Sequence, residues 1–199
     1  MSRGRPIAGD PALSQCVEEV LEAIVAKPRD RHALAVDVAT MRARIEREKP
    51  AADVFDVKLA RGGLTDCEFA AQFLVLSGLG RVPGEATPAT LARASLAGRA
   101  APTEGERLML SAALQTALLH VQRVAEVRSF EADHAPDALK QLAVAVADAT
   151  LRSAGVGGER AGVASFEALR ERLRQIQAQS REALEAVLGM KVDQRASGG

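Results

Sequence analysis

A pair of glycines is flanked by two basic and two acidic residues, in the order Lys58, Arg61, Gly62, Gly63, Asp66 and Glu68. Adjacent glycines adopt backbone conformations that side chains forbid, and they let a ligand or another chain approach the backbone closely. Thr65, with Glu68 three residues later, has the spacing of a capped helix N-terminus directly after the glycines. The free N–H groups of such an end favour anions such as phosphate.

The same residues also fit a purely structural interpretation. A glycine turn that leads into a capped helix is ordinary, and Glu68 then only closes the cap. The spacing of the glycines matches neither of two nucleotide-binding patterns, GxGxxG and GxxxxGK[ST]. The residues alone therefore support no particular cofactor.

Three segments carry motifs that occur together, and in this order, in one enzyme family. Residues 5–10 read Arg-Pro-Ile-Ala-Gly-Asp, residues 37–42 contain Asp-Val-x-x-Met-Arg, and residues 58–72 read Lys-x-x-x-Gly-Gly-Leu-x-Asp-x-Glu-Phe-x-x-Gln. They resemble the end of the nucleotidyltransferase domain, the following helix and the glycine signature of glutamine synthetase adenylyltransferases, the bifunctional adenylyltransferase/adenylyl-removing enzymes. The resemblance covers residues 3–79, and the remainder is compatible as a helical tail.

The resemblance implies AMP transfer as the chemistry. Enzymes of this family move AMP from ATP, with Mg²⁺, to a tyrosine hydroxyl of glutamine synthetase, and a related domain removes it by phosphorolysis. By this resemblance the two basic residues screen a phosphate, the two glycines bring backbone N–H groups to the nucleotide, and the two acidic residues order the cleft. These roles fall to Lys58 and Arg61, to Gly62 and Gly63, and to Asp66 and Glu68, respectively.

One part of the family pattern is missing. Related nucleotidyltransferases carry a Gly-Ser and an Asp-x-Asp pair that holds the metal ions, whereas Asp53 and Asp56 have the wrong spacing. Thr65 stands where many relatives have arginine. We therefore expect residues 1–11 to be the remnant edge of a nucleotidyltransferase domain. We expect no catalytic or metal-binding residue here, and neither Mg²⁺ nor ATP to be held by this chain alone.

Outside the glycine segment the sequence predicts one helix after another, because apolar residues recur at helical spacing between proline and glycine. The expected helices cover residues 11–26, 31–49, 65–79, 87–96, 102–125, 136–152 and 165–188. A short extended segment, residues 54–59, precedes the glycine turn. The predicted fold is an all-α antiparallel bundle of about seven helices over residues 12–188, with a disordered tail over residues 189–199.

Every long predicted helix has an apolar stripe, and those of the first two helices, together with the expected caps, are compared with the structure below. The stripe of the first helix consists of Leu13, Val17, Val20, Leu21 and Ile24, and that of the second consists of Leu34, Val38, Met41 and Ile45. Helix caps are expected at Thr65, Thr87, Thr103 and Ser165. The charges of the second helix, Arg42 included, are expected on its solvated side, although the resemblance leaves a phosphate-facing role for Arg42 open.

Composition excludes several classes of protein. The 199 residues include 26 Lys plus Arg and 26 Asp plus Glu, so the basic excess of a nucleic-acid-binding protein is absent, and 3% aromatic content offers few stacking platforms. No apolar run reaches the roughly 18 residues that span a membrane. Cys16 and Cys67 form no CxxC motif, which favours reduced thiols and a cytoplasmic location. The histidines are too widely spaced for a zinc site.

Three functional interpretations follow. In the first, the chain is the C-terminal helical region of the adenylyltransferase. Its partners are then glutamine synthetase, a PII-type signal protein and the missing nucleotidyltransferase domain. In the second, it is a non-catalytic interaction module whose helices dock a PII-type protein or glutamine synthetase. In the third, it is a helical scaffold without a ligand.

Overall fold

The computed structural model of the chain describes residues 4–130, 135–154 and 162–192. Its elements are α1 (Pro11–Ala26), α2 (Arg31–Glu48), α3 (Leu64–Leu74), a π-helical turn η1 (Val75–Leu79), α4 (Thr87–Leu96), α5 (Pro102–Val124), α6 (Asp137–Ala154) and α7 (Phe166–Leu188). Within these ranges there is no strand, and the predicted all-α class is confirmed. None of the described helices is both long and apolar enough to cross a membrane.

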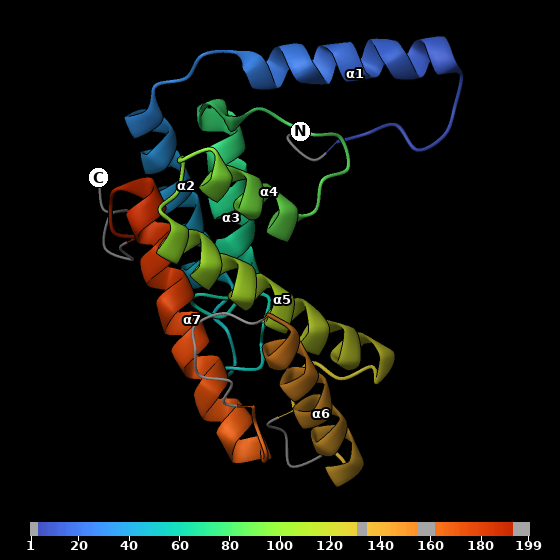
Figure 1. Ribbon diagram of the computed structural model, residues 1–199, viewed down its shortest axis with the longest axis vertical. Helices are drawn as coiled ribbons and strands as arrows, with labels where there is room; N and C mark the ends of the chain where they lie inside the picture. Colours follow the sequence, from blue (N-terminus) through green and yellow to red (C-terminus); the bar gives the residue numbers. More distant parts are fainter. Residues whose placement is uncertain (1–3, 131–134, 155–161, 193–199) are drawn as a thin grey trace.

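Two hydrophobic cores share the long helices α5 and α7. Figure 1 shows how these two helices lie among the others. The first core lies between α2, α3, α4, the first half of α5 and the end of α7. The second lies where α6 packs on the remaining parts of α5 and α7, and it includes Phe55 and Val57 from the segment before the glycines. The segment before the glycines therefore belongs to the second core, whereas α3, which follows them, belongs to the first.

Residues 54–59 form a series of turns, so the predicted extended segment is wrong. The side chain of Asp53 accepts a hydrogen bond from the N–H of Phe55 at 2.7 Å. Phe55 is fully buried, with its ring stacked on Phe166 and edge-on to Phe130. Valine and phenylalanine favour a strand, but a strand needs a neighbour for its backbone groups. The aspartate supplies a local bond that favours a turn.

Most of the predicted helix caps are also wrong. The N-cap positions of α3, α4 and α5 are held by Gly63, Ala86 and Ala101 without side-chain hydrogen bonds, in place of Thr65, Thr87 and Thr103. Prolines in the first turns of α4 and α5 have no N–H, so fewer donors need a cap there. Thr65 instead donates its hydroxyl hydrogen to the C=O of Lys58 at 2.7 Å. The predicted cap at Ser165 is confirmed, because its hydroxyl accepts from the N–H of Ala168 at 3.1 Å.

The predicted stripe of α2 is only partly right, because Leu34 and Val38 pack against the first core but are not the most buried residues of the helix. Its buried residues are Ala35, Ala39, Arg42, Ala43 and Glu46. Alanines let two helices approach closely, so they form the contact with α3 and α7, while Met41 from the predicted stripe is half exposed. The expectation that Arg42 lies on the solvated side is wrong, since its side chain is fully buried.

Helix α1 lies across one end of the bundle and extends beyond it (Figure 1). Val25 is its buried residue, whereas Leu13, Val17 and Val20 from the predicted core stripe are exposed. The predicted burial is wrong here because an apolar stripe shows which face of a helix favours burial. It does not show whether the described part of the chain has a surface that covers this face.

The chain after α7 turns back onto the bundle. Gly189 adopts a left-handed conformation that ends the helix, and Val192 is buried in the first core. Met190 and Val192 of the predicted tail are therefore packed against the first core, and residues 193–199 lie outside the described part of the chain.

Candidate functional site

The glycine pair is where the loop before α3 touches α7. Gly62 has a φ of +78°, and a Cβ atom built there would lie 1.7 Å from the C=O oxygen of Gln177 in α7. The C=O of Gly62 accepts a hydrogen bond from Gln115 of α5 at 3.0 Å. The close approach that the glycines permit is thus made by the chain's own helices, which lock the loop between α5 and α7.

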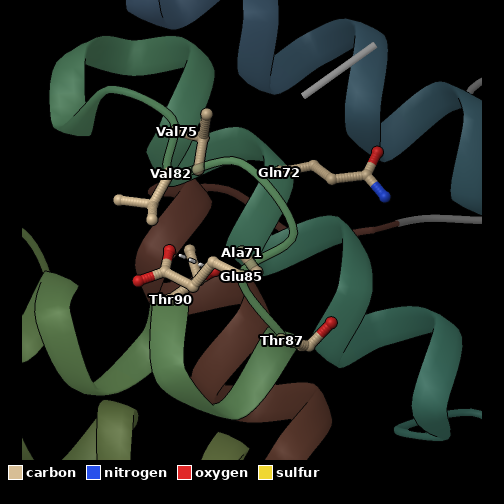
Figure 2. A pocket seen from close by; sticks show the side chains of 7 residues that line it. All are labelled: Ala71, Gln72, Val75, Val82, Glu85, Thr87 and Thr90. Atoms are coloured by element: carbon tan, nitrogen blue, oxygen red, sulfur yellow. Dashed lines mark hydrogen bonds between the residues drawn. The ribbon is translucent and has the colours of Figure 1, made fainter. Parts of the chain in front are cut away.

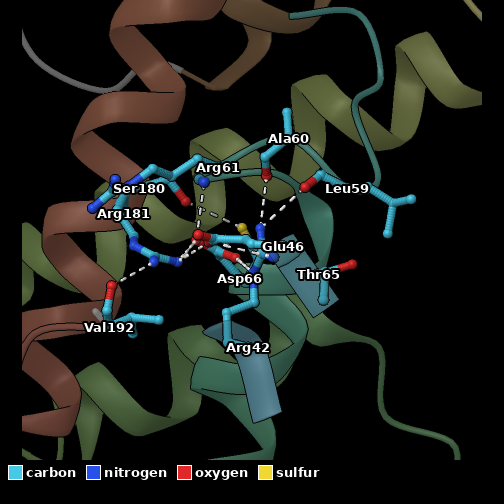
Figure 3. A network of polar contacts seen from close by, with 12 residues as sticks. Arg42, Glu46, Leu59, Ala60, Arg61, Thr65, Asp66, Ser180, Arg181 and Val192 are labelled. Atoms are coloured by element: carbon cyan, nitrogen blue, oxygen red, sulfur yellow. Dashed lines mark hydrogen bonds and ion pairs between the residues drawn. The ribbon is translucent and has the colours of Figure 1, made fainter. Parts of the chain in front are cut away.

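Asp66 in the first turn of α3 holds this loop from the other side. Its carboxylate is fully buried and accepts hydrogen bonds from the Gly62 N–H at 2.9 Å, from Arg181 of α7 at 2.9 Å, and from the Nε of Arg42 (Figure 3). Arg42 also donates to two C=O groups of the glycine loop, those of Leu59 and Ala60, at 3.1 and 3.0 Å. One carboxylate therefore connects α2, α3, α7 and the loop.

A second layer of charges surrounds Asp66. Glu46 of α2 lies 2.9 Å from Arg181 and 3.3 Å from Arg42. Glu185 lies 3.2 Å from Arg181 and 2.7 Å from Lys191. Burial alone would raise the pKa of Glu185, but its bonds to Lys191 and to the Val192 N–H, with the charges of Lys191 and Arg181, hold that pKa below its usual value. Buried charges are tolerated when they are paired in this way.

We call Arg42, Glu46, Asp66, Arg181 and Glu185 the charge clamp. Sequence reasoning found only Asp66 as a candidate site residue and placed Arg42 on the wrong side of its helix. Arg181 and Glu185 are four residues apart on α7, a spacing that equally fits an exposed ion pair, so it does not reveal that they are buried. Their partner Asp66 is distant in sequence.

The predicted site residues divide into a buried and an exposed set. Gly62, Gly63 and Asp66 are buried and serve the contact between the loop and the helices. Lys58 and Arg61 are exposed, and Arg61 lies 3.8 Å from Glu185 at the edge of the charge clamp. The two cations are thus presented to solvent by a loop whose backbone is fixed.

Glu68 lies apart from the charge clamp, in a groove between α3, α4 and α5. The groove has a volume of about 510 Å³, and the α5 residues that line it include alanines, His120 and Arg123. Its size falls within the range of small-molecule sites. The structure therefore separates the two acidic candidates: Glu68 lines a surface groove, whereas the carboxylate of Asp66 is buried.

The hollow between α3, α4 and the loop before α4 is far smaller (Figure 2). Its volume of about 10 Å³ is near that of one water molecule. Glu85 at its edge is bound by Arg93 at 2.8 Å and by the Thr90 hydroxyl at 2.8 Å, and the Arg93 contact lowers the pKa of Glu85. This hollow has no room for a nucleotide.

The described residues contain no group of three or more His, Cys, Asp or Glu side chains placed to hold a metal ion. The carboxylates of the charge clamp, those of Asp66, Glu46 and Glu185, are each bound by arginine. They therefore do not fit a Mg²⁺ site, whereas the side chains of Lys58 and Arg61 remain exposed at the surface of the loop.

Comparison with known proteins gives one consistent result. The chain is 41% identical over 153 residues to a bifunctional glutamine synthetase adenylyltransferase/adenylyl-removing enzyme of Mesorhizobium japonicum, a match that covers 74% of this chain and 15% of the relative. A protein of the same name from Rhodopseudomonas palustris strain BisB5 is 30% identical over 192 residues, 95% of this chain and 18% of the relative. One from Brucella suis is 46% identical over 78 residues, 39% of this chain and 8% of the relative.

No family model and no solved structure matches the chain. The chain spans less than a fifth of the length of these curated relatives. The similarity nevertheless extends over most of its own length, through the glycine loop and the helices that clamp it. The chain therefore belongs to the family of bifunctional glutamine synthetase adenylyltransferase/adenylyl-removing enzymes, as a region of that longer enzyme.

Proposed function

We propose that the chain is the helical region behind the second nucleotidyltransferase domain of an enzyme that transfers AMP from ATP to a tyrosine of glutamine synthetase and removes it by phosphorolysis. In this proposal the helical region holds one wall of the nucleotide cleft and catalyses no step itself. The family membership supports the reaction, and the order of the three sequence motifs supports the placement.

The observation that carries this proposal is the bonding of Asp66. Its two oxygens hold the Gly62 N–H, Arg42 and Arg181, so the loop backbone between α2 and α3 is fixed before any ligand arrives. Lys58 and Arg61 project from this loop to solvent. A cation on a fixed backbone screens a phosphate without the further cost of ordering that backbone when the nucleotide binds.

In this proposal only two of the six candidate residues contact the nucleotide directly. Lys58 and Arg61 are the groups that reach a phosphate, whereas Asp66 acts through the arginines and through Gly62. ATP and Mg²⁺ are held mainly by the nucleotidyltransferase domain, whose Asp-x-Asp pair this chain lacks. Glutamine synthetase and a PII-type signal protein are the proposed macromolecular partners of the whole enzyme.

The test replaces the matched segment of the Mesorhizobium japonicum relative with this chain and measures AMP transfer to glutamine synthetase. Lys58→Ala is expected to lower transfer by about tenfold or more, with the melting temperature unchanged, because the side chain is exposed. Lys27→Ala, at an exposed lysine outside the glycine loop, is the matched control and is expected to leave transfer intact. Equal transfer by the Lys58 variant and the parent would refute the phosphate role.

A second arm tests the absence of catalysis. The purified chain is incubated with ATP, Mg²⁺ and glutamine synthetase, and no AMP transfer is expected because the metal-binding carboxylates are missing from its sequence. Transfer above the background of a reaction without the chain would contradict this part of the proposal.

A further inference from the structure

Helix α1 presents an apolar face to solvent. Leu13, Val17 and Val20 recur at helical spacing and are 64%, 41% and 58% exposed, and Cys16 is exposed among them. The half-buried Ile24 continues the same stripe towards the end of the helix. Figure 1 shows α1 extended beyond the body of the bundle. We call Leu13, Cys16, Val17, Val20 and Ile24 the α1 face.

The opposite side of α1 is fastened to the bundle. Buried Arg81 lies 2.6 Å from Glu18 and 3.8 Å from Glu22 of α1, and it donates a hydrogen bond to the C=O of Gly4. At the C-terminal end of α1, Val25 is buried, while Arg29 donates to three C=O groups of residues 24–27 and so closes the last turn of the helix itself. The polar side of α1 is therefore used within the chain, and the α1 face is held outward in a fixed direction.

The dimensions of the α1 face limit what can cover it. A helix of 16 residues is about 24 Å long and one helix face is about 10 Å wide, which gives roughly 250 Å². A stable contact between separate proteins buries about 800 Å² on each partner. The face is too small to hold a second copy of the chain or a freely diffusing protein, but it suffices for a tethered domain, whose effective concentration is about millimolar.

We propose that the α1 face docks on an apolar surface of a neighbouring domain of the same polypeptide, of the kind that makes up the unmatched part of the longer relatives. The matched relatives have more than four-fifths of their length outside the region that this chain resembles. The face carries no charge, so the partner surface is apolar rather than acidic or basic. The choice of partner rests on the proposed function, whereas the existence of the contact rests on the exposed face.

The two cysteines provide a native probe of this contact. Cys16 is exposed on the α1 face, while Cys67 is fully buried and its burial raises the pKa of the thiol to about 11. Because the thiolate is the reactive form, N-ethylmaleimide at pH 7.5 labels Cys16 and leaves Cys67 unmodified. The Cys16→Ser variant measures any labelling of Cys67.

The experiment compares the rate of Cys16 labelling in the separate chain with the rate in the fusion in which this chain replaces the matched segment of the Mesorhizobium japonicum relative. We expect labelling to be at least tenfold slower in the fusion. Val20→Glu is expected to abolish this protection, with each variant compared with its own separate chain. Val124→Glu is the matched control, because Val124 is 87% exposed on α5, and it is expected to keep the protection.

Two results would overturn the proposal. Equal labelling rates in the fusion and the separate chain would show that no domain covers the α1 face. Protection in the separate chain that grows with its concentration would identify a second copy as the occupant. AMP transfer by the same fusion is measured in parallel. Protection of Cys16 without AMP transfer supports the contact and refutes the proposed function. AMP transfer without protection of Cys16 supports the proposed function and refutes the contact.

Discussion

Helices α1 and α7 invert the usual relation between apolar content and burial. α1 is the more apolar helix and has no lysine or arginine, yet Val25 is its buried residue. α7 carries charged residues along its length, yet its buried residues include Gln177, Arg181 and Glu185. Whether a helix of this chain is buried depends on the presence of a matching surface and not on its polarity alone. Helix α7 has such surfaces in the two cores and in the charge clamp.

Asp66→Asn is expected to have the largest effect on stability. It leaves Arg42 and Arg181 buried with one fewer negative partner, and breaking a buried ion pair in this way costs about 3–5 kcal/mol. Urea unfolding of the chain measures the loss.

The matched control is Glu48→Gln, which breaks the exposed Arg44–Glu48 pair at 2.7 Å on α2. It is expected to leave the unfolding midpoint unchanged. Equal effects of the two substitutions would mean that the charge clamp contributes no more than a surface pair, and the contrast between α1 and α7 would lose its explanation.

Gly62→Ala tests the contact between the loop and α7. The new Cβ meets the Gln177 C=O oxygen at 1.7 Å, and the φ of +78° is unfavourable for alanine. Overpacking and a left-handed backbone together cost about 3 kcal/mol. Gly189→Ala shares a left-handed backbone, φ +73°, but no atom lies within 4 Å of the new Cβ, so it is expected to cost about 1 kcal/mol. Thermal unfolding of both variants separates the clash from the backbone strain.

The sequence alone determines where the helices lie, but it does not determine the contacts between them. Helix bounds follow from local signals, and the helices at residues 11–26 and 87–96 lie where proline, glycine and the apolar runs place them. The charge clamp does not follow from local signals, because Asp66 and Arg181 are 115 positions apart. Each of them, considered alone in the sequence, is expected to be a solvated charge. The Gly-Gly pair correctly indicated a close approach of the backbone, but which chain approaches is decided by the packing of α7.

A pair of valines on α1 separates the two sides of that helix. Val25→Ala is expected to destabilise the chain by about 1.5–3 kcal/mol, because its side chain is 4% exposed. Val20→Ala, on the α1 face, is expected to change stability by less than about 0.5 kcal/mol. Chemical denaturation of the separate chain gives both values. A comparable loss for Val20→Ala would show that the α1 face is already covered in the separate chain.

The smallest expected effect is the acid response of Glu185. Its pKa in the folded chain is below the ordinary value of 4.5, because its bonds to Lys191 and Val192 outweigh its burial. As the pH falls, the unfolded chain therefore binds the proton first, so the stability that this carboxylate contributes is complete above about pH 5 and is lost as the pH falls through the folded pKa.

Melting temperatures of the parent chain and of Glu185→Gln, measured between pH 8 and pH 3, test this assignment. We expect a constant difference between them above pH 6 and a smaller one below pH 5, since the amide does not titrate. Glu171→Gln on the solvent side of α7 is the background control. If the parent and Glu185→Gln differ by the same amount at every pH, the carboxylate gains nothing from its buried partners. The charge clamp would then end at Arg181.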